Sequence, residues 1–200
     1  MKKIQYIVIT LISILSLASC ASFSGKIIRD KTEILTKESI RNIEGTYEIQ
    51  CYDSYFKSRV GREIIQFDKP NSDAFINSFT NTYTIDSTLV KKLVVDIKFI
   101  SDKEISFTYR HQDSIVNETV LGVKLRKNGM LHLKNRERDM MGVPLIYGNF
   151  EISRSRIGLS KSNDLIINHV YHITGGALIL LSDSRTRNTS YYFKRIEKTS

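Results

Sequence analysis

Apolar and polar residues alternate along most of the chain after residue 44, and this period of two constrains the fold more than any other feature. In residues 92–100 and 104–110, Leu, Val, Ile, Phe or Tyr occupies every second position, and charged or hydroxyl residues occupy most positions between them. Such alternation places the apolar side chains on one face of a β-strand and the polar side chains on the other. The pattern therefore predicts an antiparallel sheet with one buried face and one wet face.

Short turn sequences separate the alternating segments. Asn128-Gly129 lies between residues 121–126 and 131–134, and this dipeptide supplies the positive φ that a tight hairpin turn needs. Ser101-Asp102-Lys103 joins residues 92–100 to 104–110 in a second predicted hairpin. Further strands are predicted at residues 45–52, 63–67, 146–154, 156–160, 165–173, 177–181 and 190–196. The predicted turns among the last of these strands are residues 161–164, 174–176 and 183–185.

Residues 70–79 are the exception to the alternation. Phe75, Ile76 and Phe79 follow helical spacing after Asn71 and Ser72, which are suitable capping residues. We therefore expect one short helix near 70–79, packed on the sheet or over one end of it. The series of short strands and tight turns favours an all-β, antiparallel meander. Closure into a small barrel removes exposed strand edges and is the expected fold, and a β-sandwich is the alternative.

The first nineteen residues have the layout of a secretory signal peptide. Lys2 and Lys3 form a positive start, residues 4–17 are mostly Ile, Leu and Val, and small residues precede Cys20. A membrane-spanning helix is the alternative, but it needs roughly 20 apolar residues. The run in this chain is shorter and contains polar positions. Residues 1–19 are therefore predicted to be a signal peptide that is removed.

Leu17-Ala18-Ser19-Cys20 resembles the lipobox of bacterial lipoproteins. The resemblance implies a diacylglyceryl group on the Cys20 thiol and acylation of the freed amine, typically with palmitate. Because two or more acyl chains hold a protein firmly on a bilayer, the expected location is the cell envelope, with the protein anchored to a membrane by lipid. Lipoproteins retained in the inner membrane often have Asp after the cysteine. Ala21 stands there in this chain, which favours the outer membrane if the cell is Gram-negative.

The sequence after the cysteine divides into two parts. Residues 20–43 are largely polar and are expected to be a lipidated N-terminus and tether, with a short helix near their end. Residues 44–200 are expected to form one β-barrel-like domain.

The ends of this domain resemble those of the lipocalin or calycin barrels, which begin with Gly-x-Trp after a short helical turn. Gly45-Thr46-Tyr47 stands in the corresponding place, although tyrosine replaces the tryptophan and the chain contains no Trp. In that family a basic residue near the last strand packs over the Trp, and Arg195 is the matching residue here. The resemblance implies a lipocalin-like barrel with Arg195 over Tyr47.

Charge and cysteine content limit the partners. Loss of Lys2 and Lys3 with the signal peptide lowers the formal net charge from +9 to +7. A basic surface suits contact with anionic surfaces, and a merely solvated surface is the alternative. The basic residues are scattered without interleaved aromatic residues, which argues against nucleic acid. Cys51 is the one cysteine left once Cys20 is lipidated, so a buried, inert thiol is expected rather than a disulfide.

Two Arg-x-Arg pairs are the candidate anion-binding or ligand-binding residues: Arg154 with Arg156, and Arg185 with Arg187. Alternate residues of an extended chain share a face, so each pair can present two guanidinium groups to a phosphate or carboxylate. The alternative explanation is a solvated bend at residues 154–156 and an exposed loop at residues 185–187.

No pattern of catalytic or metal-binding residues is evident. His169 and His172 are the only close pair of histidines, and on a strand their odd spacing sends them to opposite faces. We therefore expect no metal site, and the chain contains no Gly-rich phosphate loop or nucleophile elbow. No catalytic residue and no cofactor is predicted, and whether the chain is an enzyme stays open.

Three functions are compatible with these features. The first is a structural or interaction module of the cell envelope, whose partners are the membrane and an envelope protein. The second is a lipocalin-like carrier that holds a small hydrophobic ligand inside the barrel. The third and least favoured is an enzyme that acts on envelope glycans or lipids.

Overall fold

The computed structural model describes residues 23–25, 28, 31–57, 64–66, 75, 79, 92–135, 137–143, 147–177 and 181–198. Most of these residues belong to one antiparallel sheet, as the alternating sequence predicted. The elements in chain order are the 3-10 helix η1 (Ile40–Ile43) and the strands β1 (Gly45–Lys57), β2 (Ile64–Gln66), β3 (Leu93–Ser101), β4 (Glu104–His111), β5 (Ser114–Leu125), β6 (Leu131–Leu133), β7 (Glu137–Val143), β8 (Tyr147–Leu159), β9 (Leu165–Ala177) and β10 (Leu181–Lys198).

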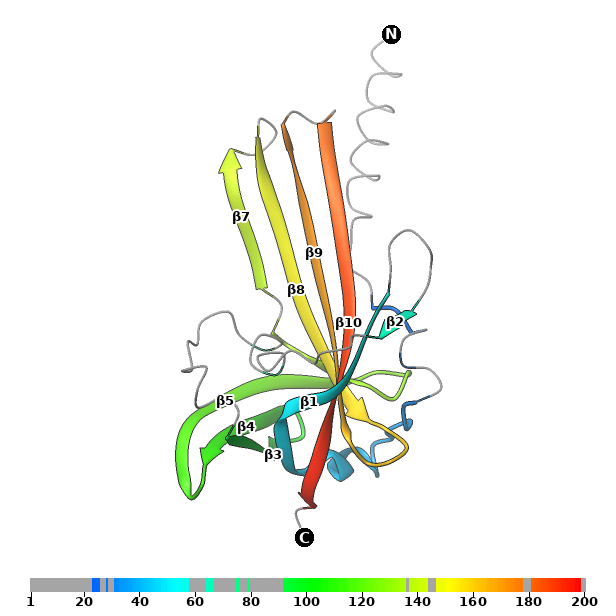
Figure 1. Cartoon of the computed structure of the whole chain (residues 1–200), viewed down its shortest axis with the longest axis vertical. Helices are drawn as coiled ribbons and strands as arrows, with labels where there is room; N and C mark the ends of the chain where they lie inside the picture. The colour runs from blue at the N-terminus through cyan, green and yellow to red at the C-terminus, as the bar shows by residue number, and fades with distance from the viewer. Residues whose placement is uncertain are drawn as a thin grey trace.

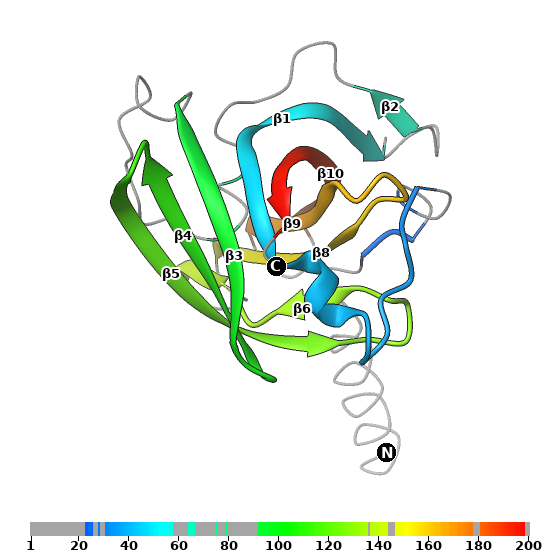
Figure 2. The ribbon, with the colours of Figure 1, turned by 90° about the horizontal axis from the view of Figure 1, so that it is seen from below.

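The sheet closes on itself, so the fold is a ring of strands rather than a sandwich of two sheets. The order around the ring is β1, β3, β4, β5, β6, β8, β9 and β10, and β10 then pairs with β1. Figure 2 looks along this ring from below. The ring is uneven because β6 contributes only Leu131–Leu133. Among the described residues, β5 meets β6 through residues 123–125, and β6 meets β8 through residues 131 and 132.

The hairpin predicted at Asn128-Gly129 is confirmed. Gly129 has a φ of +74°, and its N–H donates to Arg126 O at 2.9 Å. A Cβ atom at this position would stand 2.6 Å from the Ile34 Cα atom. Glycine is therefore needed both for the turn and for the close approach of the N-terminal segment.

Two predicted turns near the C-terminus are wrong, because β8, β9 and β10 are longer than expected. Residues 146–154 and 156–160 were predicted as separate strands, but residues 147–159 form the single strand β8. Gly175 and Gly176 lie inside β9, paired with β8 on one side and β10 on the other. A Cβ on Gly175 would stand 2.2 Å from Asn149 Oδ1, so this glycine makes room for a neighbour rather than a turn. Residues 183–185 likewise pair with β9 instead of turning.

The long strands carry the same sheet beyond the ring, as seen at the top of Figure 1. Only residues 189–198 of β10 pair with β1, and residues 181–188 pair with β9 alone. β7 joins this extension along the edge of β8. We call the side of the extension that continues the ring interior the interior face. We call the opposite side the Phe23 face, because Phe23 packs there with Phe150, Ile152 and Val170.

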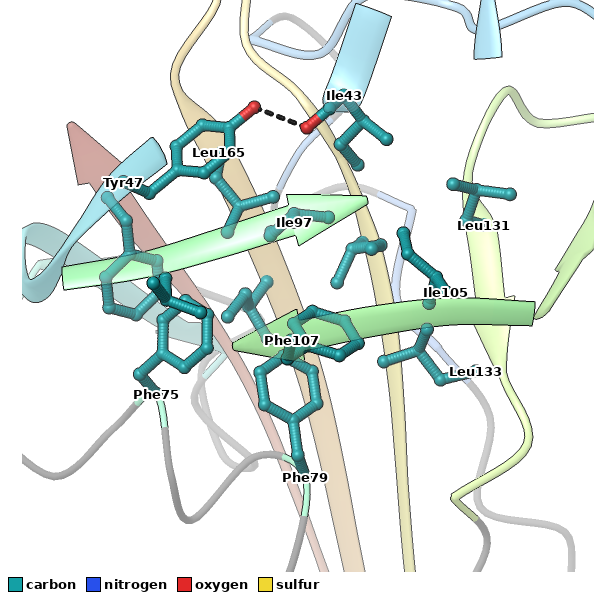
Figure 3. Close-up of a cluster of buried hydrophobic side chains, with 14 of the residues drawn as sticks. Ile43, Tyr47, Phe75, Phe79, Ile97, Ile105, Phe107, Leu131, Leu133 and Leu165 are labelled. Atoms are coloured by element: carbon teal, nitrogen blue, oxygen red, sulfur yellow. Dashed lines mark hydrogen bonds between the residues drawn. The ribbon is translucent and has the colours of Figure 1, made fainter. Parts of the chain in front are cut away.

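Aromatic side chains fill the centre of the ring. Phe75 and Phe107 are both fully buried, and Phe79 is 3 % exposed. Their ring centroids lie 6.3 Å apart for Phe75 and Phe107 and 4.6 Å apart for Phe79 and Phe107 (Figure 3). Of the helix predicted near 70–79, Phe75 is helical and Phe79 lies in a turn, and the rest of that segment is outside the described residues.

The described part of residues 20–43 lies against the ring. Ile28 is 5 % exposed and Leu35 is 2 % exposed, and Leu35 belongs to the main core. Thr32 forms an isolated β-bridge with Ser160. The Glu33 N–H donates to Leu159 O at 2.8 Å. The described residues of this segment therefore pack along the end of β8 and contribute Leu35 to the main core before the chain reaches η1.

Candidate functional site

Tyr47 and Arg195 join η1 to the lower end of the ring. Tyr47 is fully buried, and its hydroxyl donates to Ile43 O at 2.7 Å (Figure 3). The Arg195 guanidinium lies over the Tyr47 ring at 5.0 Å, and its Nη2 donates to Asn42 O at 2.6 Å and to the Tyr47 hydroxyl. Burial raises the pKa of Tyr47, and the Arg195 charge opposes that rise. Arg195 thus occupies the position over Tyr47 that the sequence analysis expected.

Replacing Arg195 by alanine should lower the free energy of unfolding by about 2–3 kcal/mol, because several charged hydrogen bonds and a cation–π contact are lost together. Urea unfolding followed by circular dichroism measures the change. Lys194→Ala is the matched control, because Lys194 is an exposed neighbour and its loss should change stability by less than about 0.5 kcal/mol. Equal effects of the two variants would show that Arg195 does not hold this end together.

A cleft of about 770 Å³ opens beside η1, between the β3–β4 turn and the end of β5. Its lining residues are Lys37, Ile40, Arg41, Phe99, Asp102, Lys103, Val123, Lys124, Leu125 and Lys134. Five of these side chains are basic and one is acidic, and the remaining four are apolar. The volume falls in the range of small-molecule sites. This composition suits a ligand that combines an anionic group with an apolar part.

The hairpin geometry brings these lysines together. The turn from β3 to β4 and the turn from β5 to β6 lie at the same end of the ring, because neighbouring strands are antiparallel. The Val123 N–H donates to Lys103 O at 2.7 Å, and the Lys134 N–H donates to Gly122 O at 2.7 Å. These backbone bonds fix the β3–β4 turn and the end of β6 to β5.

The single acidic group of the cleft is partly engaged by Arg41. Arg41 Nη1 lies 3.2 Å from Glu44 Oε1, and Arg41 Nη2 lies 3.9 Å from Asp102 Oδ1. Glu44 Oε1 also accepts a hydrogen bond from the Phe99 N–H at 2.9 Å. The three lysines Lys103, Lys124 and Lys134 have no carboxylate within ion-pair distance among the described residues. The cleft is therefore electropositive.

The two predicted arginine pairs lie on opposite faces of the sheet. The strand register aligns Ile157, Ile167 and Tyr191, and all three side chains face the core. Because side chains alternate between the two faces of a strand, this alignment determines the face of every other residue of β8 and β10. Arg154 and Arg156 then lie on the Phe23 face. Arg185 and Arg187 lie on the interior face and are exposed. Each pair shares a face as predicted, but the structure does not bring the two pairs into one site.

Arg156 is 3 % exposed and occupies a polar network on the Phe23 face. Its Nε donates to Asn168 Oδ1 at 2.7 Å, and its Nη2 donates to Ser24 O at 3.1 Å. The Phe23 ring lies 4.6 Å from the Arg156 guanidinium carbon and 5.4 Å from that of Arg154. Burial lowers the pKa of Arg156 to about 10, so the group stays charged at neutral pH. The alternative of a solvated bend at 154–156 is therefore wrong, because β8 continues through it and residues 23–24 cover it. The alternative of a loop at 185–187 is also wrong, because these residues lie in β10 and pair with β9.

Among the described residues, the four histidines are not gathered in one place. His169 faces the interior side and lies 3.0 Å from Ser155 Oγ, whereas His172 faces the other side and lies 2.7 Å from Thr186 Oγ1. The predicted separation of this pair is confirmed. Burial and the charges of Arg156, Arg126 and Arg154 lower the pKa of His132 to about 4. Within the part of the chain that the structure describes, no group of three or more metal-ligating side chains occurs.

Two further expectations concern the cysteines and the membrane. Cys51 is buried in the main core, as predicted. Cys20 and residues 1–19 lie outside the described residues. In the described ranges, no helix has the length and apolar character that a membrane span requires.

The chain matches no family model, and neither a curated protein nor a solved structure is significantly similar to it. The candidate site therefore depends on this structure alone. Sequence reasoning missed the cleft because its five basic residues come from four separate segments of the chain. Their recurrence at hairpin ends on one side of a meander was the signal that could have found them.

Proposed function

We propose that the chain is a lipid-anchored protein of the bacterial cell envelope, at the outer membrane if the cell is Gram-negative. In this proposal Cys20 bears the acyl chains, and the β-domain is an interaction module rather than a carrier or an enzyme. The cleft beside η1 binds the anionic, partly apolar group of an envelope partner. The observation that supports this role is the contrast between the electropositive cleft and the aromatic interior of the ring.

The interior argues for an interaction module. A carrier needs an internal cavity, and the centre of this ring is occupied by Phe75, Phe79 and Phe107. A hydrophobic ligand would have to displace these buried rings, at the cost of the contacts that they make. The cleft, in contrast, is already open at the surface and presents Ile40, Phe99 and Leu125 beside its lysines.

The lysines of the cleft should determine the affinity for an anionic amphiphile. Octyl phosphate, used below its critical micelle concentration, should shift the NMR signals of Lys103, Val123, Lys124 and Lys134. The double variant Lys103→Glu/Lys124→Glu should bind it about tenfold or more weakly, because hydrogen bonds to charged groups contribute about 1.5–3 kcal/mol each. An NMR titration of the full mature protein gives both affinities.

The control variant makes the same change of net charge at two lysines outside the cleft. Lys98 and Lys194 are exposed and do not line the cleft, so Lys98→Glu/Lys194→Glu should leave the affinity within about twofold, once long-range electrostatics is screened at physiological salt. If both double variants weaken binding equally, net charge and not the cleft governs binding, and the proposed site is wrong. Octyl phosphate that shifts only signals of the ring interior would instead support a carrier.

A further inference from the structure

Residues 23 and 24 are clamped on the Phe23 face. The Phe23 ring covers the guanidinium groups of Arg156 and Arg154, and its edge meets His132 with ring centroids 5.0 Å apart. Ile152 and Val170, both almost fully buried, form the apolar floor beneath it. The Ser24 carbonyl accepts the hydrogen bond from Arg156 described above. The first described residues of the chain are thus packed into the domain.

A network of buried hydrogen bonds holds the Arg156 side chain against residues 23 and 24. Asn168 is fully buried and holds Arg156 Nε through Oδ1. Its Nδ2 donates to Asn188 Oδ1 at 2.9 Å, to Thr189 O at 2.9 Å and to Ser190 Oγ at 3.1 Å. No carboxylate of the described residues forms an ion pair with Arg156. A buried charge without a counter-charge is costly, so residues 23–24 provide the cover and the carbonyl that this guanidinium needs.

The clamp limits where a lipidated Cys20 can reach. Only Ala21 and Ser22 separate Cys20 from Phe23, so their Cα atoms are at most about 11 Å apart at about 3.6 Å per residue. A chain that passed from β8 to the interior face would have to cross a neighbouring strand, spaced by about 4.8 Å, and then the thickness of the sheet with its side chains, about 10 Å. This chain length ties a lipid anchor at Cys20 to the side of the Phe23 face.

We propose that this face lies against the bilayer, so that the clamp converts the lipid anchor into a fixed orientation of the whole domain. This inference rests on the proposed lipid anchor at Cys20. The occupant of the face is an anionic phospholipid surface. The interior face of the extension, with Arg185 and Arg187, then points away from the membrane and stays available to other molecules.

The chemistry of the same side of the ring fits a membrane interface. Tyr52, Tyr55 and Tyr192 form an aromatic cluster there, with ring centroids 6.4 Å apart for Tyr52 and Tyr192 and 5.7 Å apart for Tyr55 and Tyr192. Lys31 Nζ lies 3.6 Å from the Tyr55 ring centroid. The carboxylates nearby, Asp53 and Asp164, accept hydrogen bonds from the Tyr55 and Tyr52 hydroxyls. Tyrosine is enriched where apolar and aqueous phases meet, and basic side chains are attracted to anionic head groups.

A single introduced tryptophan can test the orientation, because the chain contains no Trp. Phe150→Trp places the reporter on the Phe23 face, and Tyr171→Trp places it on the interior face of the adjacent strand. Both positions are half-buried aromatic residues, so the two variants are matched. Each variant is purified from membranes as the full acylated protein and reconstituted into phosphatidylethanolamine–phosphatidylglycerol vesicles with brominated acyl chains.

Bromine quenching should be at least twofold stronger in the F150W protein than in the Y171W protein. Adding Phe23→Ala to each should reduce this difference, because the released segment lets the domain tumble on its anchor. Equal quenching in F150W and Y171W, or a difference that F23A does not change, overturns the proposed orientation. Circular dichroism spectra confirm that each variant is folded.

Mass spectrometry of the N-terminal peptide separates this proposal from the one on which it rests. A protein without acyl chains at Cys20 shows that the anchor itself is wrong, and the orientation falls with it. An acylated protein with equal quenching in both variants leaves the anchor intact and refutes the orientation alone.

Discussion

Replacing Phe107 by alanine should lower the free energy of unfolding by about 3–5 kcal/mol, the usual cost of removing a buried phenyl ring. Phe107 is fully buried and its ring lies against those of Phe75 and Phe79. The loss therefore combines the transfer free energy of the side chain with the cavity that remains. Chemical denaturation of the mature domain gives the difference directly.

The control is Ile115→Ala on the same sheet. Ile115 is 66 % exposed, so its removal should change stability by no more than about 0.5 kcal/mol. A cost below about 1 kcal/mol for Phe107→Ala would mean that the ring centre is not tightly packed. The carrier function would then become the better proposal, because a loosely filled interior can admit a ligand.

Replacing Cys20 by alanine should move the protein from the membrane fraction to the soluble fraction. The acyl chains are the proposed attachment, each buried methylene contributes about 0.8 kcal/mol, and without them only weak surface contacts remain. The variant should also retain residues 1–19, because the lipobox resemblance implies cleavage after lipidation. Cell fractionation and mass spectrometry of the protein measure both effects.

Cys51→Ala is the matched control, because it removes the same functional group from a buried site in β1. Its location should not change, although stability falls modestly. If the Cys20→Ala protein stays with the membrane, the anchor must lie elsewhere. The envelope function and the proposed orientation would then both need replacement.

The strands were largely predictable because burial in this fold follows a simple rule. In β3 and β4, Leu93, Val95, Ile97, Ile105 and Phe107 point inward, at the alternate positions that the sequence indicates. Gly129 was also predictable, since a positive φ is a local requirement. The role of Gly175 was not predictable, because this position needs glycine to leave space for the side chain of Asn149 on β8.

The candidate site was less predictable, because its residues come together only through the way the strands pair in the folded sheet. The arginine pairs look equivalent in the sequence, but β9 separates them in the sheet and the strand register places them on opposite faces. Residues 23–24 are polar or aromatic in a segment that suggested a tether, and their contact with Arg156 spans more than a hundred residues. No local pattern contains such information.

Because the ring closes unevenly, its strands are not held together equally well. β8, β9 and β10 are joined along thirteen-residue ladders, whereas β6 touches β8 only through Leu131–Ile157 and His132–Arg156 among the described pairs. Beyond the last of these pairs, the Ser155 N–H of β8 donates a hydrogen bond to Asn135 Oδ1 at 3.1 Å. Local opening of the sheet should therefore begin between β6 and β8, where the fewest backbone pairs must break. The strands β8, β9 and β10 should stay paired to higher temperature or force than this part of the ring.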